Sequence, residues 1–413
     1  MTAQGSTEKQ PSEEQRHMED STSSVTPGVS TEELERRWTL AREVMRDDQI
    51  DFLVARNDEE FLGGYIRWFT DVPARHSYPY TVIFPVDEEM TLVSPGPFSP
   101  NDPGPPPWSV RGVKKRLGAP YFTSAHFTSS YDAELVAGVL KEKKKPVVGL
   151  VGTSTLPFVF IEYLKKNVPG AKFVDVTDKI DQLKAIKSEE EIVLIKRAAE
   201  MQDVAFEHLL KTIKPGMKES EVYAEAVHSC NLQGSSRGLV LVASASPGTP
   251  APFKPLHLQN KVIQEGEYLS LLIEMNGPGG FYTELGRTIS FGKPTQELQD
   301  AFATAVEAQA LTLKNLKPGA IPKEIWDKNN EFLTSKGYLP EARLYAHGQG
   351  YDLVERPLIR HDDPMNIQAG MSIVVHPTAS TKTVWTGVVD NYMVTEDGVS
   401  ACLHRTPKKI YEL

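Results

Sequence analysis

The chain has 413 residues and a formal net charge of −10, with 24% charged and 40% hydrophobic residues. This composition is typical of a water-soluble globular protein, and the length predicts two domains. The acidic balance argues against nucleic acid as a partner. No apolar run reaches the roughly 18 residues of a membrane span, so no membrane attachment is expected.

The N-terminal segment is polar and lacks the apolar stretch of a secretory signal. Residues 1–30 are predicted to form a disordered tail, because they carry too few apolar groups to offset the entropy of ordering. The two cysteines, Cys230 and Cys402, predict no disulfide framework. A reducing, cytoplasmic location fits these features best.

A helix is expected next, with Thr31 as its N-cap and apolar residues at helical spacing up to Met45. A proline-rich loop covers residues 94–108. Strands that alternate with helices predict an α/β fold for an N-terminal domain at residues 31–178. The expected strands lie at 50–55, 81–85, 90–93 and 145–151, and a helix lies over 135–140.

The pattern changes near residue 178. Ser188 and Glu191 form a capping box, and apolar residues at helical spacing as far as Leu209 predict a long amphipathic helix. The elements that follow predict a second domain at residues 179–413. Its further helices are expected at 219–232 and 296–316, and its strands at 239–243, 268–273 and 373–375.

The most informative motif is Tyr345–Pro357, which reads Tyr-Ala-His-Gly-Gln-Gly-Tyr-Asp-Leu-Val-Glu-Arg-Pro. It resembles the His-Gly-x-Gly-x-x-x-His-Glu-x-Pro signature of the creatinase, methionine aminopeptidase and prolidase family, except that the second histidine falls on Val354. The resemblance covers roughly residues 32–413. It implies a smaller α/β N-terminal domain followed by a pita-bread α+β catalytic domain. It also implies ligands in the order Asp, Asp, His, Glu, Glu around two divalent ions.

This chain departs from that ligand set. Counted against the family, the five positions fall on Ile273 or, with a one-residue gap, Glu274, then on Glu284, His347, His376 and Val389, with Asp390 beside the last. Ile273 and Val389 offer no donor atom, so a two-metal site is not expected. Glu284, His347 and His376 could hold one Fe, Mn or Zn ion, or act as a metal-free acid/base cluster. Both possibilities stay open.

Three further residues are candidates by the same resemblance. The stretch around Tyr282 looks closest to creatinase, the metal-free member, although creatinase's catalytic glutamate is Gly286 here. Tyr282 is therefore a candidate for binding substrate. Arg287 is a candidate for the same role or for an ion pair with Glu284. His257 is a candidate for proton transfer.

In creatinase-like enzymes, the first domain of one subunit completes the active site of its partner, often with an arginine that holds a carboxylate. The resemblance therefore implies a homodimer with a shared active site. Arg67 and Arg75 are the candidates for binding an acidic small-molecule substrate from the partner subunit.

These features predict a hydrolase that cleaves a C–N bond of a small carboxylate-bearing molecule. Glu284, His347 and His376 would activate water or move protons, and Glu274 would bind the leaving group. The enzyme alternative is a lyase or decarboxylase that breaks a C–C or C–S bond, with one metal ion or none. The alternative from another class is a non-catalytic binding module. Two-metal Xaa-Pro peptidase activity is not expected.

Overall fold

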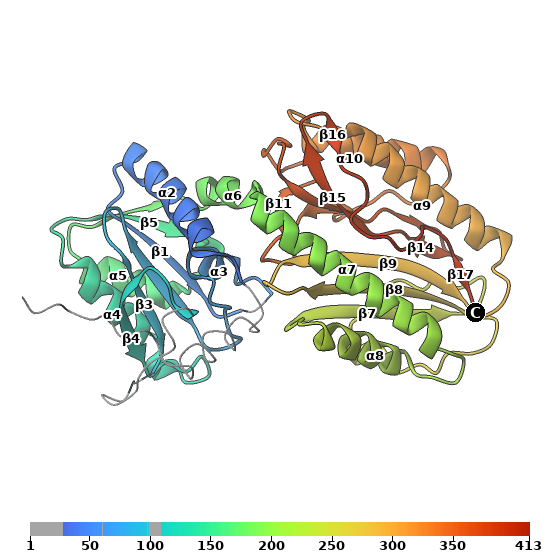
Figure 1. Cartoon of the computed structure of the whole chain (residues 1–413), viewed down its shortest axis with the longest axis horizontal. Coiled ribbons are helices and arrows are strands. Elements are labelled where there is room, and N and C mark those ends of the chain that lie inside the picture. The colour runs from blue at the N-terminus through green and yellow to red at the C-terminus, as the bar shows by residue number, and fades with distance from the viewer. Residues whose placement is uncertain (1–27, 60, 97, 99–108) are drawn as a thin grey trace, which may run out of the picture.

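The computed structural model describes residues 28–59, 61–96, 98 and 109–413. These residues form two domains side by side, each with its own sheet structure and helices (Figure 1). The predicted two-domain α/β architecture is confirmed. Residues 1–27 of the predicted tail and most of the predicted loop at 94–108 lie outside the described residues, so those parts stay predictions. The tail prediction is wrong for its last residues, because Val29 is buried in the core and Ser30 caps a helix. Ser94 and Pro95 belong to a strand rather than to the predicted loop.

The N-terminal domain is built on a six-stranded mixed sheet in the order β4-β3-β2-β1-β5-β6. The strands are β1 (Phe52–Asn57), β2 (Tyr80–Pro85), β3 (Met90–Pro95), β4 (Val113–Ala119), β5 (Val147–Val151) and β6 (Lys172–Asp175). The helices are α2 (Thr31–Asp47), α3 (Gly64–Thr70), α4 (Tyr131–Leu140), α5 (Phe158–Asn167) and α6 (Thr177–Ala185), with short 3-10 turns η2 (His126–Thr128) and η3 (Thr153–Thr155).

Strand β1 is buried along its whole length because helices cover both faces of the sheet. Leu53 packs in the cluster that contains residues of α2 and α3, whereas Val54 packs in the cluster that contains residues of α4 and α5. This alternation is why the sequence shows a continuous apolar run rather than a polar and apolar pattern.

Helix α2 begins one residue earlier than expected. Ser30, not Thr31, is the N-cap: its hydroxyl accepts the backbone N–H of Glu33 at 3.1 Å. The predicted N-cap at Thr31 is therefore wrong. Ser30 has an extended backbone, which aims its side chain at the free N–H groups of the first turn, and Thr31 is already helical.

The C-terminal domain contains one sheet in the order β17-β9-β8-β7 and another in the order β11-β10-β12-β15-β16. Its helices are α7 (Glu189–Thr212), α8 (Glu219–Leu232), α9 (Gln296–Asn315) and α10 (Pro322–Ser335), with the 3-10 turn η4 (Leu256–Leu258). Its strands are β7 (Gly238–Ala245), β8 (Tyr268–Asn276), β9 (Tyr282–Ser290), β10 (Ala346–Gly348), β11 (Glu355–Leu358), β12 (Ser372–Val375), β13 (Thr378–Ser380), β14 (Trp385–Gly387), β15 (Asp390–Thr395), β16 (Gly398–Val399) and β17 (Tyr411–Glu412).

Helix α7 starts at the predicted capping box of Ser188 and Glu191 and crosses the sheet of β7, β8 and β9 (Figure 1). Its residues Phe206 and Leu209 pack in one core cluster with Leu271 of β8 and Leu285 of β9. Strand β9 also meets the other half of the domain, because Gly286 and Val389 exchange two backbone hydrogen bonds of 3.1 and 3.2 Å. This bridge brings β9 beside β15 and so closes the site described below.

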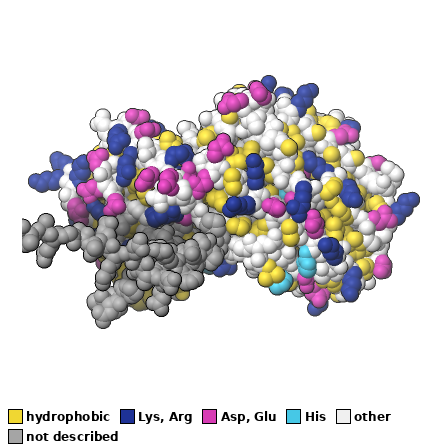
Figure 2. All heavy atoms as spheres, in the orientation of Figure 1, with side chains coloured by type: hydrophobic (Ala, Val, Ile, Leu, Met, Phe, Trp, Pro, Cys, Tyr) yellow, Lys and Arg dark blue, Asp and Glu magenta, His cyan; other side chains and the backbone are white. Residues whose placement is uncertain are grey.

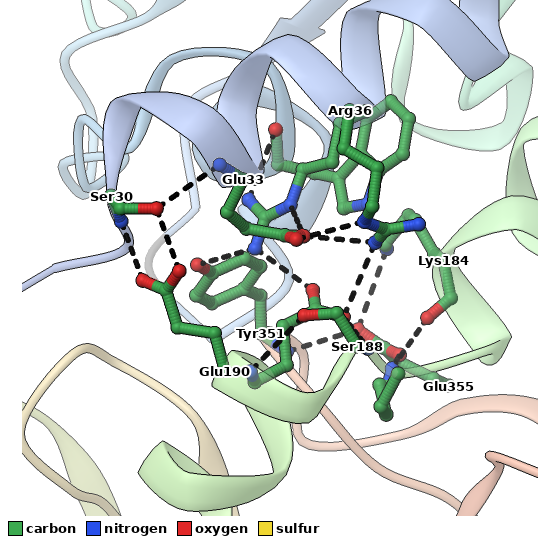
Figure 3. A network of polar contacts seen from close by, with 12 residues as sticks. Ser30, Glu33, Arg36, Lys184, Ser188, Glu190, Tyr351 and Glu355 are labelled. Atoms are coloured by element: carbon green, nitrogen blue, oxygen red, sulfur yellow. Dashed lines mark hydrogen bonds and ion pairs between the residues drawn. The ribbon is translucent and has the colours of Figure 1, made fainter.

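The two domains share a network of buried charges (Figure 3). Arg37 of α2, which is 0% exposed, binds the carboxylates of Glu33 and Glu191 at 2.8 Å each. Its Nη2 also donates to the hydroxyl of Tyr351 at 3.2 Å. A buried cation is stable only when it is paired in this way, so α2, α7 and the Tyr351 loop hold one another in place.

Helix α6 continues this connection. Lys184, in α6, binds Asp352 at 2.7 Å. Lys187, two residues after the end of α6, binds Glu355 at 2.7 Å. The predicted domain boundary, between residues 178 and 179, falls inside α6. The exact limits of the two domains stay a prediction.

On the face shown in Figure 2, basic and acidic side chains are interspersed rather than gathered by sign. Within the described ranges, no helix combines the length and the apolar character needed to cross a membrane. Cys230 and Cys402 are both free thiols, and Cys230 is buried.

Candidate active site

Glu274 of β8 and Glu284 of β9 lie directly opposite each other in the hairpin, and both side chains are buried. Because successive residues of a strand point to opposite faces, Ile273 points the other way and packs in the core cluster with Leu285. Of the two predicted alternatives, Glu274 is therefore the one that shares a strand face with Glu284.

Two imidazoles reach the same place from β10 and from the end of β12. The rings of His347 and His376 meet edge to face with their centres 5.3 Å apart. Nε2 of His347 lies 3.4 Å from Oε1 of Glu284. One ligand atom from each of Glu284, His347 and His376 lies within 4.8 Å of the other two. The structure thus brings together the three residues that form the predicted centre.

Sequence reasoning missed two residues at this centre. Nε2 of Gln349 donates to Oε1 of Glu284 at 3.0 Å and to Oε1 of Glu274 at 3.2 Å. Oε1 of Gln349 accepts from Nδ2 of Asn391 at 2.7 Å. The available signal for Gln349 was its place as x in the His-Gly-x-Gly motif. Asn391 carried no signal of its own, because its partner is 42 residues away.

Burial and neighbouring charges give the two carboxyl groups different pKa values. Burial raises the pKa of Glu274 well above its usual range, and the charge of Glu284 adds to that shift. Burial also pushes the pKa of Glu284 upward, but the hydrogen bond and charge of His347, with the charge of His376, outweigh it and hold this pKa at about 2. A protonated and an ionised carboxyl side by side can serve as acid and base.

Burial lowers the pKa of His376 to about 4, although Glu284 opposes the shift. His376 is therefore neutral at pH 7, and at that pH the support for the Glu284 carboxylate comes above all from His347. Nδ1 of His347 donates to the carbonyl oxygen of Gly348 at 2.9 Å. A carbonyl only accepts, so Nδ1 carries the proton and Nε2 is the atom that faces Glu284.

The last family ligand position is apolar here. Val389 is 2% exposed and packs in one cluster with Leu272 and Val374. A Cβ added to Gly286 would lie 2.3 Å from the Val389 side chain, so the close approach of β9 and β15 needs glycine at that point. Asp390 beside it points to the opposite face and is bound by Arg287.

The predicted ion pair between Arg287 and Glu284 is wrong. The two residues are three apart on β9 and so point to opposite faces of the strand. Instead, Nη2 of Arg287 binds Asp390 at 2.7 Å. The remaining guanidinium N–H groups donate to the backbone carbonyls of Pro407, Gly286, Val389 and Thr406. All five N–H groups are thus occupied, which argues against the predicted substrate contact of Arg287.

A cavity of about 250 Å³ lies at the seam between the two domains. Arg67 and Arg75 line it from the N-terminal domain, and Arg237, Asn276 and Tyr282 line it from the C-terminal domain. Asn276 and Tyr282 are the cross-strand pair next to Glu274 and Glu284 on the same face. The cavity therefore begins about 7 Å along the strands from the carboxyl pair.

Arg67 is held in that cavity by its neighbours. Its Cζ lies 5.3 Å from the centre of the Tyr351 ring. A Cβ on Gly280 would come within 2.0 Å of the same atom, so glycine at that position leaves room for the guanidinium. Both Arg67 and Arg75 thus reach a cavity of their own chain, whereas the prediction assigned them to the site of a partner subunit.

The structure does not bring His257 to the centre. His257 is exposed in η4, where its backbone carbonyl accepts a hydrogen bond from the side chain of Asn260. A second group of ligand-type side chains, Asp390, Cys402 and His404, lies on the Arg287 side of β15. Arg287 and Lys408 already neutralise Asp390 at 2.7 and 3.8 Å, so this group is a poor host for a cation.

A family model for metallopeptidase family M24 matches residues 193–397, which run from within α7 to just past β15. The C-terminal domain belongs to metallopeptidase family M24. This finding confirms the family inferred from the motif at Tyr345–Pro357. The matched residues thus belong to a peptidase family.

Individual relatives agree with this family. The chain is 28% identical over 247 residues to an uncharacterised peptidase of Bacillus subtilis, covering 59% of this chain and 69% of the relative. It is 27% identical over 260 residues to the Xaa-Pro dipeptidase of Pyrococcus horikoshii, covering 62% and 73%. In three dimensions it resembles an X-Pro aminopeptidase from Thermotoga maritima, with a TM-score of 0.77 at 18% identity over 91% and 99% of the two chains. That likeness concerns the fold.

The family name implies a metal, and the ligand atoms of this chain determine how many metal ions the site can hold. Glu284, His347 and His376 offer one oxygen and two nitrogen atoms close together, which suits one transition-metal ion. Val389 and its apolar neighbours offer nothing to a second ion. The described residues at this centre therefore fit one cation and not two.

Proposed function

We propose that this chain is a hydrolase that cleaves a C–N bond in a small substrate bearing a carboxylate. The observation that carries the proposal is the convergence of Glu284, His347 and His376 beside a second buried carboxyl group, Glu274, whose pKa burial raises well above its usual range. Hydrolysis of a C–N bond requires a base to take a proton from water and an acid to protonate the leaving nitrogen. Two neighbouring carboxyl groups with different pKa values can supply the base and the acid.

The roles follow from the state of each group. The Glu284 carboxylate, 3.4 Å from Nε2 of His347, accepts the proton of the attacking water. Neutral His376 orients the same water from the other side. The carboxyl of Glu274, whose pKa burial raises, lies one cross-strand pair away from the arginine cavity and donates its proton to the leaving nitrogen. A transition-metal ion, when held by Glu284, His347 and His376, would polarise the substrate oxygen or water.

The arginine cavity supports the choice of an anionic substrate. Arg67 and Arg75 line a cavity that begins about 7 Å along the strands from the carboxyl pair. Their guanidinium groups suit the acid end of a small molecule whose C–N bond lies over the pair. Tyr282 lines the same cavity and would contact the substrate there.

We further propose that ordinary two-metal Xaa-Pro peptidase activity is absent, because Val389 replaces a ligand carboxylate. We also propose that the chain forms a homodimer and is located in the cytoplasm. The first can be tested by light scattering of the purified chain.

The test is turnover of a panel of small N-substituted amino acids and dipeptides, Xaa-Pro dipeptides included, by the full chain in water enriched in ¹⁸O. Hydrolysis places ¹⁸O in one product, whereas a lyase product carries none. The variants His347→Ala and His376→Ala should each lose at least a hundredfold in kcat/KM. The matched control, His361→Ala, removes an exposed histidine and should keep full activity.

Two results would overturn the proposal. One is a product without ¹⁸O, which would favour the lyase alternative. The other is a folded wild-type chain that turns over no substrate while it binds one of them equally well in wild type and in both histidine variants. That outcome would favour a binding module.

A further inference from the structure

Gln349 lies between the two carboxyl groups of the centre and is 0% exposed. Its Nε2 has three acceptors: Oε1 of Glu284 at 3.0 Å, Oε1 of Glu274 at 3.2 Å and the carbonyl oxygen of Leu353 at 3.2 Å. Its Oε1 has one donor, Nδ2 of Asn391, at 2.7 Å. The side-chain amide thus joins both carboxyls to β15.

The orientation of this amide follows from chemistry. The backbone N–H of Glu284 can only donate, and it donates to Asn391 at 2.7 Å, so the atom that accepts it is Oδ1. Nδ2 of Asn391 then faces Gln349 and can only donate, so the atom of Gln349 that accepts it is Oε1. Nε2 of Gln349 must therefore point at the carboxyls. A flipped amide would place donor against donor at the Asn391 contact.

This position is the one that a cation shared by Glu274 and Glu284 would need. Such an ion would sit about 2.0–2.2 Å from an oxygen of each carboxylate. Nε2 of Gln349 lies 3.0 and 3.2 Å from one oxygen of each, which leaves no room for an ion between the same oxygens. The amide supplies two N–H donors there but no positive charge.

We propose that Gln349 is a positioning residue that replaces a bridging cation between Glu274 and Glu284. By holding the pair with a neutral group, it limits the centre to the single cation that Glu284, His347 and His376 can bind. Removing the amide should therefore create a second cation site from Glu274 and Glu284. The inference concerns cation number and does not depend on which bond the proposed hydrolase cleaves.

The experiment measures bound Mn²⁺ by equilibrium dialysis and elemental analysis on the full chain. The wild type should bind no more than one equivalent, and Gln349→Ala should bind one equivalent more than the wild type. The double variant Gln349→Ala with Glu274→Gln should return to the wild-type number. A substitution that merely loosened the site would lower the number instead of raising it.

The matched control is Gln309→Ala. Gln309 is also 0% exposed, and its Nε2 also donates to a carboxylate, Asp390, at 3.1 Å, but no second carboxylate among the described residues accepts from it. This variant should keep the wild-type number of Mn²⁺ ions. An equal gain in Gln309→Ala would attribute the effect to general loosening and overturn the inference.

Gln349→Ala leaves Nδ2 of Asn391 unpaired, so a second variant, Gln349→Met, keeps the side-chain volume while it removes the amide. It should show the same gain, with folding checked by circular dichroism. Two measurements that keep Gln349 in place decide the matter even without a folded variant at position 349. Binding of two equivalents by the wild type, or loss of an equivalent on Glu274→Gln alone, would show that Glu274 is a ligand and overturn the inference.

Discussion

Nη2 of Arg287 donates to Oδ1 of Asp390 over 2.7 Å, and neither side chain is exposed to solvent. Arg287→Met keeps much of the side-chain volume but leaves the Asp390 carboxylate buried with less compensation. We expect a loss of roughly 3–5 kcal/mol in the free energy of unfolding, measured by urea denaturation. A loss below about 1 kcal/mol would contradict the structural role. Lys323→Ala, at an exposed ion pair with Asp327, is the control and should change stability by no more than about 0.5 kcal/mol.

Removing one imidazole should abolish the single cation site. His376→Ala takes one of three ligand atoms from the group formed with Glu284 and His347. We expect the Kd for Zn²⁺ or Mn²⁺ to rise by more than the roughly 10- to 100-fold that follows loss of a group that only supports a ligand. Isothermal titration calorimetry checks this on both proteins. Equal affinity in wild type and variant would remove His376 from the ligand set.

Arg67→Ala should weaken substrate binding without slowing chemistry. Loss of a charge-assisted contact costs about 1.5–3 kcal/mol, which corresponds to a rise in KM of roughly 10- to 150-fold at nearly constant kcat. A neutral amide analogue of the substrate should show no such difference between wild type and variant. Gly280→Ala should reproduce the defect, because its Cβ would displace the guanidinium of Arg67. A fall in kcat at constant KM would assign Arg67 to the chemical step instead.

Stability should depend on pH through His404. Burial lowers the pKa of His404 to about 4, against an ordinary value near 6.5. Its Nε2 faces Oε1 of Gln202 at 3.1 Å, since Nε2 of Gln202 donates to two backbone carbonyls. The unfolded chain therefore binds a proton more readily than the folded chain between pH 6.5 and pH 4. Stability is greatest above the ordinary pKa and falls as the pH decreases through that window.

The substitution His404→Gln removes this dependence while it keeps a donor for Gln202. Between about pH 7.5 and pH 4.5, wild type should lose about 2–3 kcal/mol of unfolding free energy more than the variant, as measured by denaturant titration at each pH. His361→Gln, at an exposed histidine, should follow the wild type. If His404→Gln has the same pH profile as the wild type, burial of a neutral His404 is not the cause.

Local signals in the sequence were enough for the elements that position the site. The predicted helix at 219–232 coincides with α8, and the capping box of Ser188 and Glu191 is present at the start of α7. Both depend on contacts within one or two helical turns. The motif at Tyr345–Pro357 likewise identified His347 and led to Glu284 and His376, because these residues occupy fixed places in a known pattern.

The rest of the site depends on hydrogen bonds between residues that lie far apart in the sequence. Gln349 reaches Glu274 across 75 positions and Glu284 across 65, so their contact appears only when β8, β9 and β10 are assembled. The faulty pairing of Arg287 with Glu284 has a simpler cause. Strand alternation places residues three apart on opposite faces, so two residues close in the sequence of β9 lie far apart in space.

The contacts of Arg37 with Glu191 and Tyr351 limit where the chain can be truncated. A fragment beginning at α7 would retain nearly all that resembles the family, yet it would leave Glu191 without the guanidinium that neutralises it. The same fragment would lack Lys184, so the buried carboxylate of Asp352 would lose its cation as well. The N-terminal domain thus supports the loop that follows His347 and Gln349. To graft that loop onto another peptidase scaffold, one would have to transfer α2 and α6 together with it.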